Sequence, residues 1–64
     1  MARYTGTWTF MNVMHPKHRE SDTATVEADD EDAAKWRIRQ RGADRLFGGG
    51  MLIYFNASNV RKIA

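Results

Sequence analysis

Charge is segregated along the middle of this chain, and the order of the charges constrains the fold more than any other feature. Seven of the eight acidic residues come first: Glu20, Asp22, Glu27, Asp29, Asp30, Glu31 and Asp32. Five basic residues then follow: Lys35, Arg37, Arg39, Arg41 and Arg45. Acids stabilise the start of an α-helix and bases stabilise its end, because the helix dipole is positive at its N-terminus. The order predicts a single helix whose cap oxygen comes from Asp29 or Asp30.

Two opposite sides of this predicted helix are apolar. At about 100° per residue, Ala34 and Ile38 lie nearly opposite a stripe that contains Ala33, Trp36, Gln40, Ala43 and Phe47. We expect the Trp36 stripe to face the core, because a small domain needs its large side chains inside. Gly42 is a candidate helix end, which would shorten that stripe. Either packing places Arg37 and Arg41 on one flank of the helix and Lys35 and Arg39 on the other.

Two strands are predicted before the helix. From Tyr4 to Val13 the residues alternate, which indicates a strand that turns Tyr4, Trp8 and Phe10 to the core and its threonines to solvent. Pro16 lies in the polar stretch 15–22 and ends this strand, because proline cannot donate to a sheet. Alternation resumes over 23–28, which predicts a second strand, antiparallel to the first.

The chain after the helix predicts a return to the sheet. The three glycines at 48–50 break the chain, and the apolar run 51–55 is typical of a central strand. Residues 56–59 have turn chemistry, and 60–63 are expected to form a short edge strand. The sequence therefore predicts an α+β domain spanning 1–64. Its expected architecture is a small antiparallel sheet of three or four strands with one helix on one face, in ββαβ or ββαββ order.

Composition limits the class of protein. The chain has 64 residues, no cysteine and a formal net charge of +2. A chain of this length has a small core, and without cysteine it has neither disulfides nor thiolate metal sites. Oligomerisation is one way to bury more surface, and the sequence leaves it open. With no signal-like apolar run and no membrane-spanning stretch, we expect a cytoplasmic protein.

The search for catalytic and metal-binding patterns favours structural interpretations. His15 and His18 would need further ligands to hold a metal, and consecutive acids at 29–32 diverge on a helix instead of converging. The glycines at 48–50 lack the lysine and hydroxyl of a phosphate loop. Ser21 and Ser58 have no evident base. We expect a protein without enzymatic activity, metal or cofactor.

The basic residues of the helix are the predicted partner-binding residues: Lys35, Arg37, Arg39, Arg41 and Arg45. They suit two kinds of partner. Arginine and lysine bind the phosphates of nucleic acids, with an affinity that falls as salt rises. Arginine is equally frequent at the centres of protein–protein interfaces. A solvated helix face that pairs with the chain's own acids is the structural alternative.

Residues 23–57 resemble the ββαβ core of small phage-encoded anti-CRISPR proteins, notably type I-F inhibitors. The matching pattern is the strand end 25–28, an acidic cap, the run 33–35, a basic helix end and an apolar segment after a glycine turn. The resemblance implies a non-enzymatic inhibitor that docks on a host CRISPR surveillance complex and hinders binding of target DNA. It assigns the contacts to the exposed bases Lys35, Arg37, Arg39 and Arg41. The alternative is a small nucleic-acid-binding or regulatory protein that uses the same bases.

Overall fold

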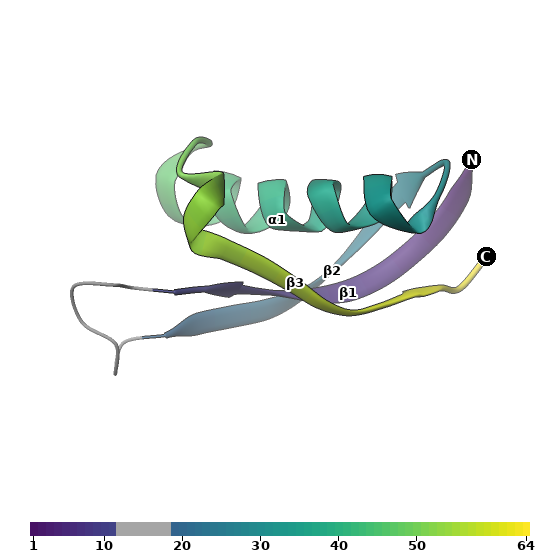
Figure 1. Cartoon of the computed structure of the whole chain (residues 1–64), viewed down its shortest axis with the longest axis horizontal. Coiled ribbons are helices and arrows are strands. Elements are labelled where there is room, and N and C mark those ends of the chain that lie inside the picture. The colour runs from purple at the N-terminus through teal and green to yellow at the C-terminus, as the bar shows by residue number, and fades with distance from the viewer. Residues whose placement is uncertain (12–18) are drawn as a thin grey trace.

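A computed structural model describes residues 1–11 and 19–64 of the chain. The described residues form three strands, one α-helix and one 3-10 turn, in the order β1 (Ala2–Phe10), β2 (Glu20–Ala28), α1 (Glu31–Phe47), η1 (Leu52–Tyr54) and β3 (Phe55–Lys62). The helix lies across one face of the sheet, and both chain termini lie beside its first turn (Figure 1). The predicted α+β class and the ββαβ order are confirmed.

The sheet is antiparallel and has the order β2-β1-β3, so the first strand is the central one. Tyr4, Gly6 and Trp8 are buried beneath the helix, whereas the threonines between them face the open side of the sheet and are half-buried. The predicted aromatic face is therefore confirmed. The first strand ends at Phe10 within the described residues, and positions 12 and 13 of the predicted strand lie outside them. The second strand begins at Glu20, three residues earlier than predicted.

The ends of α1 follow from its sequence. Asp30 is the N-cap, and its carboxylate Oδ1 accepts the Ala33 N–H at 2.8 Å. At the other end Gly48 adopts a left-handed conformation with φ 68°, and its N–H donates to the Asp44 carbonyl at 3.0 Å. Glycine reaches this conformation without the steric cost that a Cβ brings. The helix therefore passes through Gly42 and ends five residues beyond it.

The packing of α1 on the sheet differs from the prediction at Trp36, although Ala43 of the same predicted stripe is fully buried. Ala34 and Ile38 are fully buried against the sheet, whereas the Trp36 side chain is 53% exposed. The reason is the fit between Gly42 and Trp8: a Cβ built on Gly42 would lie only 2.6 Å from the indole of Trp8. Small residues on this side of α1 let the helix approach the aromatic face closely. A second indole has no room between them, so the expectation that Trp36 faces the core was wrong.

The return from helix to sheet also differs from the prediction. Residues 51–55 do not form a central strand: Met51 is left-handed with φ 56°, and the next three residues form η1. Strand β3 begins at Phe55 and runs at the edge of the sheet through the predicted turn 56–59 and into the predicted strand 60–63. Asn59, with φ 55°, lies where the register between β1 and β3 shifts. One bulged edge strand therefore replaces the two predicted strands.

Candidate functional site

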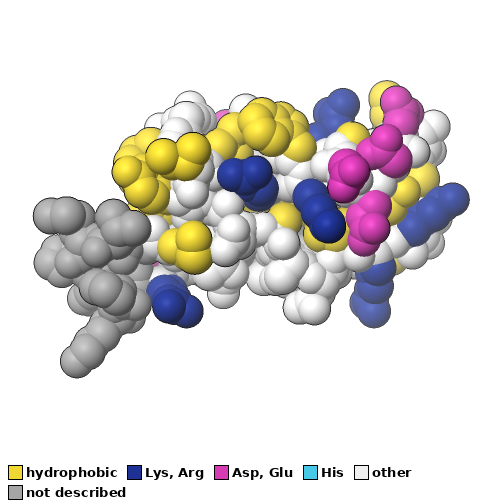
Figure 2. All heavy atoms as spheres, viewed as in Figure 1, with side chains coloured by type: hydrophobic (Ala, Val, Ile, Leu, Met, Phe, Trp, Pro, Cys, Tyr) yellow, Lys and Arg dark blue, Asp and Glu magenta, His cyan; other side chains and the backbone are white. Residues whose placement is uncertain are grey.

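Apolar side chains are exposed on the side of α1 that faces away from the sheet. Trp36 and Phe47 of the helix are 53% and 44% exposed, and Met51 and Ile53 of the following segment are 49% and 77% exposed. In Figure 2 apolar side chains gather over the end of the helix and the segment that leads into β3. We call Trp36, Phe47, Met51 and Ile53 the outward surface. It contains the two large residues of the stripe that the helical periodicity had assigned to the core.

Phe47 connects the outward surface to the core. Its ring lies 5.2 Å from that of Phe10 and 6.1 Å from that of Phe55, in edge-to-face arrangements. Phe55 is 1% exposed and also contacts Trp8, at 5.9 Å between ring centroids. Packed aromatic rings lose little further conformational freedom on binding. Phe47 therefore ties this end of the outward surface to the core.

Arg39 fixes the glycine-rich return to the helix. Its Nε donates to the Phe55 carbonyl at 2.9 Å and its Nη2 to the Leu52 carbonyl at 2.7 Å. The guanidinium also lies over the Trp36 ring, 5.7 Å from its centroid. These bonds reach a carbonyl at the start of η1 and one just beyond its end, and the Leu52 carbonyl also accepts the Phe55 backbone N–H. Two donor atoms of Arg39 are therefore already used by carbonyls of the chain itself.

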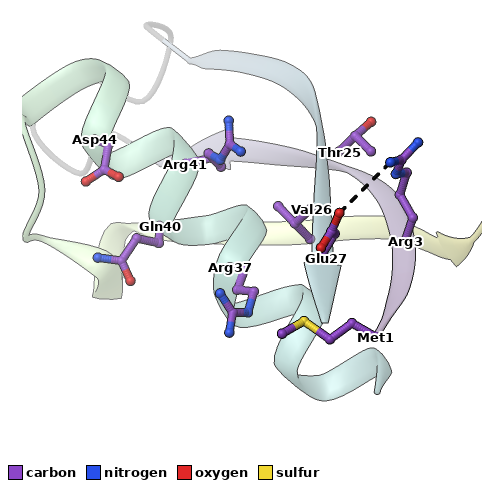
Figure 3. Close-up of a pocket in the computed structure, with 9 residues that line it drawn as sticks. All are labelled: Met1, Arg3, Thr25, Val26, Glu27, Arg37, Gln40, Arg41 and Asp44. Atoms are coloured by element: carbon purple, nitrogen blue, oxygen red, sulfur yellow. Dashed lines mark ion pairs between the residues drawn. The ribbon is translucent and has the colours of Figure 1, made fainter. Parts of the chain in front are cut away.

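Arg37 and Arg41 occupy the opposite flank of α1, beside β2. They line a groove of about 630 Å³ together with Met1, Arg3, Thr25, Val26, Glu27, Gln40 and Asp44 (Figure 3). On the sheet side of the groove, an Arg3 Nη2 atom of β1 lies 3.9 Å from a Glu27 carboxylate oxygen of β2. Within residues 1–11 and 19–64, Arg37 and Arg41 form no ion pair. The predicted separation of the basic residues onto two flanks is confirmed.

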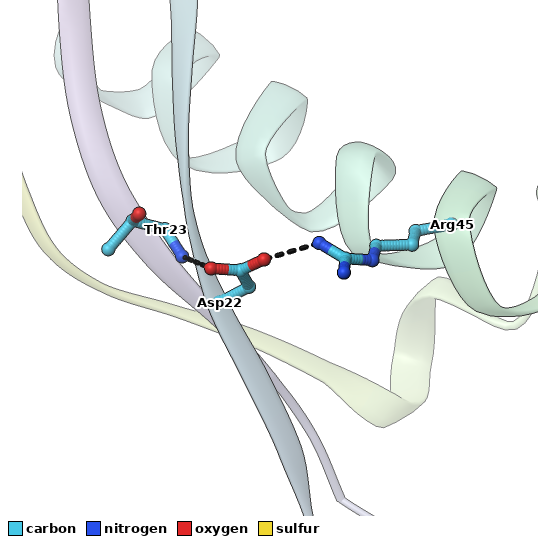
Figure 4. Close-up of polar contacts among 3 residues, drawn as sticks. All are labelled: Asp22, Thr23 and Arg45. Atoms are coloured by element: carbon cyan, nitrogen blue, oxygen red, sulfur yellow. Dashed lines mark hydrogen bonds and ion pairs between the residues drawn. The ribbon is translucent and has the colours of Figure 1, made fainter.

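Lys35 and Arg45, the remaining predicted bases, lie in different environments. Lys35 is exposed and, four residues before Arg39, lies on the same side of the helix. Arg45 Nη1 pairs with the Asp22 Oδ2 atom of β2 (Figure 4). The other Asp22 oxygen accepts the Thr23 N–H at 2.8 Å. Arg45 therefore holds the helix end to the sheet, and the five bases do not form one continuous patch.

The histidines His15 and His18 lie outside the described residues. Within the part of the chain that the structure describes, no three acidic or histidine side chains converge on a point where a metal ion would bind. None of the described helices is long and apolar enough to span a membrane.

Sequence reasoning missed Met51 and Ile53, because it assigned both to a central strand. Trp36 was expected to face the core, whereas the structure leaves it exposed. The usable signal was the presence of two apolar stripes on one helix, since a three-stranded sheet can cover only one of them.

The fold and the site define a small α+β domain with an unpaired apolar surface beside a basic helix. No protein-family model, curated protein or solved structure matches the chain.

Proposed function

We propose that this chain is a non-enzymatic protein-binding domain that docks through its outward surface. The observation that supports the proposal is the orientation of Trp36: a large apolar side chain of the helix is left exposed instead of being packed in the core. Exposed tryptophan and other large apolar residues next to arginine are the composition of interface centres. Phe47 and Arg39 hold the surface in place before any partner arrives, which lowers the entropy cost of binding.

The composition of the outward surface favours a protein partner over nucleic acid. Binding to a nucleic-acid backbone requires several unpaired Lys or Arg side chains close together. Here Arg39 is bonded to carbonyls and Arg45 to Asp22, and the groove beside Arg37 also contains Glu27 and Asp44. Four large apolar side chains would gain nothing from a phosphate backbone, but would bury apolar area against a protein.

The specific partner class follows from the resemblance to small anti-CRISPR proteins. On this proposal the chain is a phage-type inhibitor that docks on a host CRISPR surveillance complex and hinders binding of target DNA. Trp36 supplies the apolar anchor, while Lys35 and Arg37 lie on either side of it and meet acidic groups of the complex. Arg39 contributes by positioning Trp36 and η1.

The experiment measures target-DNA binding by a purified type I surveillance complex with and without this protein. We expect the protein to inhibit DNA binding and Ile53→Ser to abolish most of that inhibition. Ile63→Ser is the matched control, because Ile63 is the same residue type, is 50% exposed and lies just beyond the end of β3, outside the outward surface. Equal inhibition by the two variants would remove Ile53 from the docking surface, and no inhibition by the unmodified protein would refute the inhibitor proposal.

A nucleic-acid-binding or regulatory protein is the second candidate function. It is favoured by Lys35, Arg37 and Arg41, which are exposed and form no ion pair within the described residues. This candidate predicts retention of free DNA or RNA that weakens steeply with salt, and loss of retention on charge reversal at Arg37 and Arg41. A gel-shift titration at low salt tests it: if free DNA and RNA do not shift, this function is excluded.

A further inference from the structure

The backbone groups of β2 point alternately toward β1 and away from the sheet, because β2 is an edge strand. Arg3 of β1 bonds the chain end beyond β3, donating to the Ala64 carbonyl at 2.9 Å and accepting from the Ile63 N–H at 2.8 Å. Since backbone groups alternate along a strand, the even-numbered residues of β1 bond β2. Tyr4 of β1, for example, is paired with Val26 of β2. It follows that the odd-numbered residues of β2 direct their N–H and carbonyl groups outward.

One half of this outer edge is occupied by the chain itself. Asp22 accepts the outward N–H of Thr23 and pairs with Arg45, so a carboxylate and a guanidinium lie where a further strand would bind (Figure 4). The strand ends at Ala28, just before the cap of α1. The open part of the edge is therefore short and is centred on the outward backbone groups of Thr25 and Glu27.

The groove beside α1 runs along this open part of the edge. Figure 3 shows Arg37 and Arg41 on its helix wall, and Thr25 and Glu27 on the strand. The groove is lined by three arginines and two carboxylates, so its net charge is positive. Arg3 lies beside Glu27, and Asp44 lies beyond Arg41. Unpaired backbone groups and unpaired guanidinium groups thus face the same space.

We propose that the open half of the β2 edge binds an extended acidic segment of a protein partner, which adds to the sheet as a strand beside Thr25 and Glu27. Backbone hydrogen bonds to these two residues hold the segment, as in other cases of strand addition. Side chains alternate along a strand, so every second side chain of the added segment faces α1. Carboxylates at those positions form charge-assisted hydrogen bonds with Arg37 and Arg41. The site shares Arg37 with the proposed docking contacts but contains none of the four residues of the outward surface, and it extends the proposed protein-binding function to a second contact.

The first test uses a capped peptide in which glutamate alternates with threonine or valine, titrated into the whole chain at low salt. NMR-detected hydrogen exchange should slow at least about tenfold at Thr25 and Glu27 on saturation. Thr23 is the internal control, because its N–H is already bonded to Asp22 and should change far less. A peptide methylated on its backbone nitrogens should not bind, since it lacks the donors that strand addition needs. Binding of the methylated peptide, or unchanged exchange at Thr25 and Glu27, would overturn the proposal.

The second test separates the charges of the groove from the overall charge. The double variant Arg37→Gln/Arg41→Gln should bind the peptide at least about tenfold more weakly. The control Lys35→Gln/Arg61→Gln removes the same charge away from the groove and should bind as the unmodified chain does. Trp36→Ala should also bind the peptide normally. A failure of the β2 edge site can therefore be told apart from a failure of the proposed docking through the outward surface. Equal weakening in both double variants, or displacement of the peptide by a short single-stranded DNA that binds more tightly, would overturn the assignment to an acidic peptide.

Discussion

At the scale of single residues, Gly42 decides how the helix packs. A glycine inside a helix ordinarily costs about 1 kcal/mol relative to alanine. Here it lies in the middle of α1 and is fully enclosed, with the ring of Trp8 where a Cβ would be. The unfavourable helix propensity of Gly42 is offset by close contact between helix and sheet, and this contact excludes Trp36 from the core.

Gly42→Ala is therefore expected to destabilise the fold, although alanine has a higher helix propensity than glycine. A Cβ 2.6 Å from Trp8 forces the indole or the helix to move, which we expect to cost about 1–3 kcal/mol of unfolding free energy. Urea unfolding measures the effect, with Gln40→Ala on the exposed side of α1 as the control, for which we expect a change within about 0.5 kcal/mol. An increase in stability for Gly42→Ala would show that the helix does not approach Trp8 so closely.

Arg39 has a structural role that its charge does not reveal. Arg39→Gln is expected to lower the unfolding free energy by about 1–3 kcal/mol, because the carbonyls of Leu52 and Phe55 lose charged donors. Arg39→Lys should not restore it, since a lysine cannot reproduce two bonds from one planar group. Arg37→Gln is the matched control and should leave stability within about 0.5 kcal/mol. Equal unfolding midpoints for Arg39→Gln and Arg37→Gln would contradict this role.

At the scale of elements, α1 carries two apolar stripes, and the sheet covers the large side chain of only one of them. Ile38 is 0% exposed on the covered side and Trp36 is 53% exposed on the other. The helix, its N-cap and the ββαβ order of elements could be predicted, because they depend on local rules such as the acid–base order, the Asp30 cap and the alternation of β1. The choice between stripes could not, because it depends on Trp8, which is distant in sequence and meets the helix only in the folded chain.

The segment after the helix also could not be predicted from local sequence rules. An apolar run such as 51–55 is typical of a strand, but three glycines with positive φ and a left-handed Met51 turn the chain back before Phe55. The bonds from Arg39 that stabilise this turn come from 13 and 16 residues earlier in the chain. No local pattern could have placed Ile53 on the surface.

The two stripes of α1 predict opposite effects of substitution. Ile38→Ala should cost about 2–5 kcal/mol, because it removes a fully buried side chain. Trp36→Gln should change the unfolding free energy by less than about 1 kcal/mol. Acrylamide quenching of the folded chain provides a second readout, since Trp36 should be accessible and Trp8, at 3% exposed, should be protected. If Trp36→Gln were as destabilising as Ile38→Ala, the helix would be packed on the other stripe.

At the scale of the whole molecule, both edges of the sheet are partly covered by polar contacts. Asp22 and Arg45 close one half of the β2 edge, and Arg39 bonds the carbonyl of Phe55 where β3 begins. Polar side chains along the edge of a sheet limit its non-specific pairing with the sheets of other molecules. Among the described residues, the two candidate binding sites are the outward surface and the short open edge of β2. The two sites lie on different sides of α1.

The central claim is that the outward surface binds a protein, and the affinity of Trp36→Ala tests it most directly. Isothermal titration of a purified type I surveillance complex measures this affinity for the variant and for the unmodified chain. Loss of a central tryptophan typically costs about 2 kcal/mol or more, so we expect the variant to bind at least about 30-fold more weakly at unchanged fold stability. Equal affinity of the two chains for the complex, or no binding by either, would contradict the account.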